Sequence, residues 1–186
     1  MNKKLKFGIV VGDSDEEFFY NDSWRIESYP NYKRITVAPI KNQIDIMLDI
    51  LKSFEPPYWC LYVLLVPRNE NEAGRYQCPY PMSYEEISDF VSKYKNFFET
   101  DGRHHLWLGS AKTKQLMVYD QHNIIYLYDK IKKMSKYLKS KGFNKGKISF
   151  PFPHVHYYNQ ENDVNEENLL KYWNWIRTPL REQDEY

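Results

Sequence analysis

Glycine is scarce in this chain: only 7 of its 186 residues are glycine, and they form neither a glycine-rich phosphate loop nor a Gly-x-Ser-x-Gly turn. Both motifs need glycine, because the backbone must approach a phosphate closely or turn sharply at the nucleophile. The sequence therefore contains none of the common motifs for nucleotide binding or for a serine nucleophile.

Cysteine is rarer still. Cys60 lies in an apolar run, and Cys78 lies in a predicted loop beside Pro79. Two cysteines are too few for a disulfide scaffold, and their spacing is not that of a zinc site or a redox motif. Cys60 is typical of a small buried hydrophobic residue. Cys78 with a remote histidine is a weak catalytic pair, because no neighbouring residue indicates an electropositive setting.

Neither charge sign dominates, since 26 lysines and arginines accompany 25 aspartates and glutamates and the net charge is +1. Such a chain has no global field that would attract nucleic acid or an anionic membrane. No apolar run is long enough for a membrane span, and the run from Phe7 to Val11 is too short for a signal-peptide core. We therefore expect a soluble cytoplasmic protein without a membrane partner.

The lysine-rich segment 130–147 is the local exception to this balance. A basic helix can bind nucleic acid or a membrane surface. Aromatic residues are few within it, however, and the acidic stretch 161–167 offsets its charge. A solvated face, or a contact with an acidic protein partner, is the stronger interpretation.

Two periodicities predict the secondary structure. Alternating or continuous apolar residues predict strands, over residues 6–11, 24–29, 33–38, 58–66, 105–109, 115–119 and 124–128. Apolar residues at helical spacing predict helices, over residues 41–53 and 83–99, over 130–141, and from 163 to a stop before Pro179. Prolines confine 147–158 to an edge strand or an irregular extended segment, and 13–22 is either a short helix or a loop.

Two of these helices carry a capping-box pattern, in which a polar cap is followed three residues later by glutamate. The pairs are Ser83 with Glu86 and Asp163 with Glu166. Gly102 follows the 83–99 helix, at a place where a left-handed C-terminal residue is favoured.

Because hairpins interrupt any parallel pattern, the economical fold is α+β. We expect a single domain over residues 1–186, with a mixed, largely antiparallel sheet of about six to eight strands and about four packed helices. The polar residues 181–186 are expected to form a frayed tail. The segment 58–66 is the candidate for the centre of the sheet, because it is apolar on both faces.

All five histidines lie in three short clusters, and none lies in the first hundred residues. The clusters are 101–105, 120–122 and 154–156. His154 and His156 are two apart in an extended segment, so both imidazoles point to one side. Two imidazoles supply half of a first-row metal site, which Asp120, His122 or His104 could complete. The pattern allows a divalent metal such as zinc, but we favour the alternative that these histidines stack on neighbouring aromatic residues.

A second use of the clusters is acid–base chemistry. Arg103 suits a phosphate or carboxylate, and His104, Asp120 and His122 could transfer protons near neutral pH. His104 and His105 alternate into a strand, so they cannot easily serve one site. The alternative, which we favour, is that an Asp101–Arg103 ion pair fixes the turn.

A long polar connection, 67–82, offers a third candidate site. Loops of this length are usually functional or disordered, and Arg75, Tyr76 and Gln77 could recognise a ligand or a protein partner there.

Three functions remain open. The first is a non-catalytic binding protein that recognises a protein partner, as an inhibitor does, because aromatic residues and arginine dominate interface energetics and aromatics make up 17% of the chain. The second is a metal-assisted hydrolase of phosphoesters or amides with a His-rich site. The third is a nucleic-acid-associated protein that uses the lysine-rich helix. We rank the three functions in this order, with the binding protein first.

Overall fold

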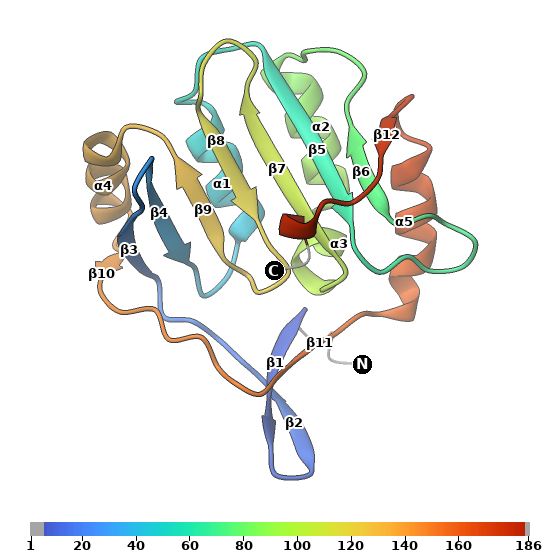
Figure 1. Ribbon diagram of the computed structural model, residues 1–186, viewed down its shortest axis with the longest axis horizontal. Coiled ribbons are helices and arrows are strands. Elements are labelled where there is room, and N and C mark those ends of the chain that lie inside the picture. The colour runs from blue at the N-terminus through green and yellow to red at the C-terminus, as the bar shows by residue number, and fades with distance from the viewer. Residues whose placement is uncertain (1–5, 185–186) are drawn as a thin grey trace.

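The chain forms two β-sheets, a large one and a small one (Figure 1). The computed structural model describes residues 6–184. The large sheet has nine strands in the order β10-β3-β4-β9-β8-β7-β5-β6-β12, and all neighbours are antiparallel except β10 and β3. Its strands are β3 (Ser23–Ser28), β4 (Lys33–Ala38), β5 (Tyr58–Leu64), β6 (Gly74–Gln77), β7 (His104–Ser110), β8 (Leu116–Tyr119), β9 (Ile125–Tyr128), β10 (Asn144–Lys145) and β12 (Ile176–Thr178).

The small sheet has three strands in the order β11-β1-β2 and lies at the bottom of the view in Figure 1. It consists of β1 (Phe7–Val11), β2 (Ser14–Glu17) and β11 (His154–His156). The first and last thirds of the chain therefore meet in it.

Helices complete the structure, which is α+β as the sequence predicts. They are α1 (Gln43–Leu51), α2 (Tyr84–Lys93), α3 (Lys95–Thr100), α4 (Ile131–Ser140), α5 (Asp163–Leu170) and the 3-10 turns η1 (Gln160–Asn162) and η2 (Glu182–Asp184). Figure 1 shows α1, α2 and α3 against one face of the large sheet. The main hydrophobic core lies between them and that face.

Strand β5 is paired on both sides, with β7 and β6, and is therefore an interior strand. The prediction that it lies at the centre of the sheet was wrong, because the middle position of the nine belongs to β8. Alternate residues such as Cys60, Tyr62 and Leu64 point into the helical core and are 0% exposed. The capping box of α2 is also confirmed, because Ser83 Oγ accepts from Glu86 N at 3.2 Å and Glu86 Oε2 accepts from Ser83 N at 2.8 Å.

The prediction for the last helix was wrong in two respects. The helix α5 ends at Leu170 and does not continue toward Pro179. Trp173, which the helical spacing placed in the helix, instead packs on Phe90 with ring centres 4.3 Å apart. Asp163 does not cap the helix. Its carboxylate accepts from Arg68 Nη2 at 2.9 Å, and a hydrogen bond between two charged groups is stronger than one to a neutral end-of-helix N–H.

Gly102 is not in a left-handed conformation, contrary to the prediction. A side chain there would meet the carbonyl oxygen of Lys6 at 2.4 Å and the Cβ of His156 at 3.0 Å. Gly102 also donates its N–H to the carbonyl of Tyr157 at 2.8 Å. The residue is glycine because the small sheet docks directly on this backbone.

The predicted tail is docked as far as Asp184, which is 1% exposed and forms an ion pair with Arg75. Residues 185–186 of the expected tail lie outside the described residues.

Candidate metal centre

Strand β11 holds two imidazoles on one side. His154 and His156 alternate with Val155, and their partners on β1 are Ile9 and Phe7. Directly paired residues of an antiparallel sheet share a face, so Phe7 and both histidines point the same way.

The third imidazole comes from the large sheet. His122 lies in the turn between β8 and β9, and its ring centre is 5.2 Å from that of His154 and 4.8 Å from that of His156. The centres of His154 and His156 are 5.2 Å apart, so the rings form a nearly equilateral triangle. One ligand nitrogen from each can be chosen so that all three lie within 4.8 Å of one another. The predicted convergence of these three histidines is therefore present.

The β8–β9 turn is fixed by Asp120, which is 6% exposed. Its Oδ1 accepts from the backbone N–H groups of His122 and Ile124, both at 2.9 Å. Its Oδ2 lies 3.1 Å from His122 Nδ1 and accepts from Tyr126 at 3.2 Å. Asp120 therefore holds Nδ1 of His122 and does not belong to the group of ligand atoms that lie together. This leaves Nε2 of His122 free for a metal, an arrangement typical of outer-shell carboxylates.

Burial raises the pKa of Asp120, but the hydrogen bonds from His122 and Ile124 outweigh that cost, so its pKa lies below the usual value. Burial, followed by the neighbouring His122, lowers the pKa of His154. The same causes lower the pKa of His156 to about 4. Both rings are thus neutral at pH 7, and neutral imidazole is the form that binds metal.

Aromatic rings enclose the triangle. The ring of Phe7 is 5.5 Å from His122, 5.4 Å from His154 and 5.9 Å from His156. A ring almost equidistant from three others lies on the axis of their triangle, and Phe7 is wholly buried. Phe7 therefore closes the inner side, which leaves the outer side for a ligand.

Two candidate residues from the first cluster lie elsewhere. His104 is 0% exposed and packs on the helical side of β7 among Phe97, Phe98 and Tyr62. Arg103 is bound by Asp101 through Nε at 2.8 Å and Nη2 at 2.7 Å. The alternative expectation of an Asp101–Arg103 ion pair is confirmed, and neither Arg103 nor His104 joins the imidazole triangle.

His105 is a histidine that the sequence analysis assigned to no candidate site. It follows His104 on β7, faces the opposite side of the sheet and is 5% exposed. Since Leu106 pairs with Tyr119, His105 stands across from Asp120. Its Nε2 is buried without a hydrogen-bond partner, and burial lowers its pKa to about 4. Strand alternation showed that one of the two histidines must face this side; only the packing of the helices decides which.

Lys6 directly precedes Phe7, the first residue of β1, and is wholly buried. Its amine donates to the carbonyl of Phe98 at 3.2 Å and lies 3.7 Å from the centre of the Tyr119 ring. Burial lowers its pKa to about 7, although Asp120 and Asp101 act in the opposite direction.

The predicted loop site is in fact a strand, β6. Arg75 is 9% exposed and lies over the ring of Trp107, with Asp184 as its ion-pair partner. Tyr76 is 8% exposed. Both side chains are largely buried, although Arg75 also lines the hollow beside Gln77. Gln77 is exposed and lines a hollow of about 530 Å³ together with Trp59 and Tyr80.

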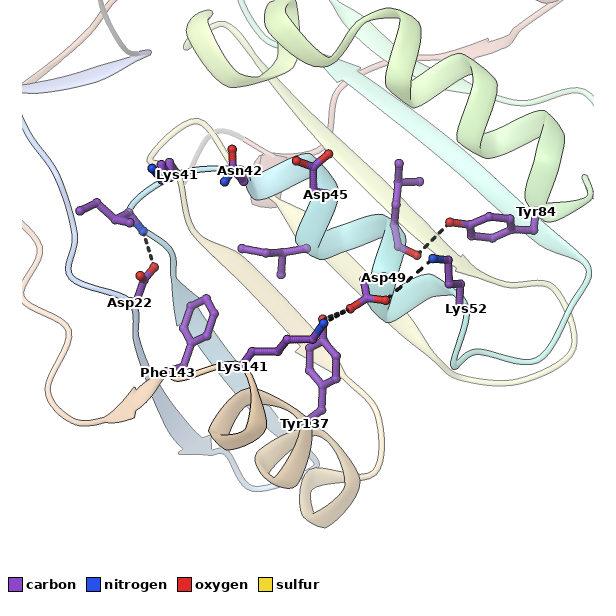
Figure 2. A pocket seen from close by; sticks show the side chains of 13 residues that line it. Asp22, Lys41, Asn42, Asp45, Asp49, Lys52, Tyr84, Tyr137, Lys141 and Phe143 are labelled. Atoms are coloured by element: carbon purple, nitrogen blue, oxygen red, sulfur yellow. Dashed lines mark hydrogen bonds and ion pairs between the residues drawn. The ribbon is translucent and has the colours of Figure 1, made fainter.

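A larger hollow of about 610 Å³ lies between α1 and α4 (Figure 2). Figure 2 shows Asp49 at its centre, where it accepts from Tyr137 at 2.8 Å and meets Lys141 at 2.7 Å and Lys52 at 3.9 Å. Asp49 is therefore paired with two lysines of the same hollow, which is typical of a surface groove between helices. Lys133 of α4 likewise donates to the carbonyl of Ser53.

No protein-family model, curated protein or solved structure matches this chain. Within residues 6–184, no helix has the length and apolar character needed to cross a bilayer.

Proposed function

We propose that the protein binds one divalent metal ion through His122, His154 and His156 and is a metal-assisted hydrolase. The observation that supports the proposal most directly is that three imidazole nitrogens lie within 4.8 Å of one another. One comes from the β8–β9 turn of the large sheet, and two come from β11 of the small sheet. Three protein nitrogens with one open position are the ligand set of catalytic zinc.

The surroundings support a catalytic role over a purely structural one. A structural zinc site is closed by four protein ligands, whereas the group found among the described residues has three. Zinc in such a site lowers the pKa of bound water to near 7. Hydrolysis then breaks the C–O, C–N or P–O bond of the substrate: the OH of water joins carbon or phosphorus, and its proton goes to the leaving group.

Metal analysis tests this proposal. Wild-type protein dialysed against zinc should retain about one zinc per chain, and His122→Ala, His154→Ala and His156→Ala should each lose it. His104→Phe is the matched control, because it removes a histidine that packs among aromatic rings and should leave the zinc content unchanged. Zinc retained by all three alanine variants contradicts the proposal.

Activity is the second arm of the test. Wild-type protein loaded with zinc should hydrolyse p-nitrophenyl acetate or p-nitrophenyl phosphate, lose that activity in chelator and regain it when zinc is added. If zinc binds stoichiometrically but neither ester is cleaved, the hydrolase proposal fails although the metal site stands.

A binding protein for a protein partner is the second candidate. It is favoured by the hollow beside β6, where Tyr80 is 53% exposed next to Trp59 and Gln77, because exposed aromatics are enriched in interface hot spots. One partner recovered at a fixed stoichiometry, and lost with Tyr80→Ala but retained by His154→Ala, would place the function there.

A further inference from the structure

The candidate metal centre has two partly exposed phenylalanines, Phe150 and Phe152, beside it. The ring of Phe150 lies 4.5 Å from His122 and 5.1 Å from His154, edge-on to both. It is nevertheless 43% exposed. Phe150 therefore flanks the His122–His154 side of the triangle with one part of its ring and meets solvent with the other.

Phe152 is the second of these phenylalanines. Its ring lies 6.4 Å from that of His154, and the residue is 89% exposed. A phenylalanine exposed to that degree buries almost no area and stabilises the fold very little. Pro151 and Pro153 flank it, and proline fixes its own backbone φ angle and restricts the residue before it. The backbone that carries the Phe152 ring is therefore restricted in conformation, so less backbone entropy is lost when a ligand packs on the ring.

The charges around the centre do not suit an anionic substrate. The neighbouring cation, Lys6, is 0% exposed, and its amine is directed to the carbonyl of Phe98 and the ring of Tyr119. The neighbouring anion, Asp120, stands directly behind His122. Enzymes that act on phosphate groups supply cations or oriented donors to the phosphate oxygens. A neutral acyl group fits this setting better.

We infer that the centre takes a carboxylic ester or amide that carries an aromatic group. The aromatic ring of the substrate packs on Phe150 and Phe152, and its acyl group faces the three histidines. This inference rests on the proposed metal site, but it goes further by choosing an uncharged acyl substrate over a phosphoester.

Cobalt-loaded protein and two hydroxamates test the inference. Benzohydroxamate and acetohydroxamate bind metals through the same group and differ in the aromatic ring, and the visible spectrum of cobalt(II) reports their binding. For each protein, the dissociation constant of acetohydroxamate is divided by that of benzohydroxamate, which gives the preference for the aromatic ligand. The preference of wild type divided by that of Phe152→Ala isolates the contribution of the Phe152 ring. We expect that ring to favour benzohydroxamate by about 2- to 10-fold, the range of an aromatic pair. Phe150→Ala should have an effect of the same sign, whereas Tyr80→Ala, in a separate hollow, should leave the ratio unchanged.

Each other outcome overturns a defined part. An unchanged ratio in Phe152→Ala and Phe150→Ala, with a normal cobalt spectrum, overturns the aromatic subsite and leaves the metal site intact. Inorganic phosphate that binds more tightly than either hydroxamate overturns the acyl preference. A protein that gives no cobalt spectrum overturns the proposed function and this inference together.

Discussion

The behaviour of the candidate centre depends on one carboxylate. Asp120 uses one oxygen to hold the β8–β9 turn and the other to orient the imidazole of His122. The sequence predicted strands over 115–119 and 124–128, so Asp120 and His122 were expected in the connection between them. It placed Asp120 among the metal ligands, however, since no sequence pattern distinguishes a ligand from the group behind it.

Asp120→Asn should therefore weaken zinc binding by about 10- to 100-fold, the usual effect of removing an outer-shell partner. The amide can still accept from the backbone N–H groups through its oxygen, but its NH₂ would face His122 Nδ1 and favour the wrong tautomer. Competition with a chromophoric zinc chelator measures the change. Asp89→Asn, an exposed change on α2, is the control, and equal affinities for the two variants would refute this role.

His105 gives the second prediction at this scale. Because burial lowers its pKa from the ordinary value of 6.5 to about 4, the unfolded chain binds a proton that the folded chain does not between those pH values. The free energy of unfolding must then fall as pH decreases through this window, by up to about 1.4 kcal/mol per pH unit for one such group. His105→Gln should reduce that slope in urea unfolding measured from pH 4 to 6.5. A slope identical to wild type would contradict the burial argument.

At the scale of elements, local rules predicted most of the fold. Ser83 begins α2 as its capping box requires, and the prolines of 147–158 confine β11 to the edge of the small sheet. The rules failed where distant residues decide. The end of α5 depends on the packing of Trp173 against Phe90, and the role of Gly102 depends on two strands from opposite ends of the chain.

Gly102→Ala tests that docking. The new methyl group would lie within 3.0 Å of both the Lys6 carbonyl and the Cβ of His156, so strand β11 must shift. We expect about 1–3 kcal/mol of destabilisation, as for overpacking, together with weaker zinc binding because His156 moves. Gly146→Ala is the matched control, since a Cβ there meets nothing within 4 Å. Gly102→Ala with wild-type stability and zinc affinity would show that the docking is looser than described.

At the scale of the whole molecule, the two sheets meet, and this contact brings His122 together with His154 and His156. The sequence indicated that histidines gather in three clusters, but it could not say which clusters meet. That depends on the pairing of β1 with β11, a contact between segments near the two ends of the chain. It also depends on the β8–β9 turn, which Asp120 fixes and which places His122 beside β11. The first cluster contributes no metal ligand to the triangle, because α3 buries His104 on the opposite face.

X-ray absorption at the zinc edge of the loaded protein tests the central claim most directly, because it identifies the atoms bound to the metal. The account predicts only nitrogen and oxygen neighbours at about 2.0–2.1 Å, with outer scattering from three imidazole rings that falls to two in His154→Ala. Sulfur at about 2.3 Å, or the absence of imidazole scattering, would contradict a centre built on His122, His154 and His156.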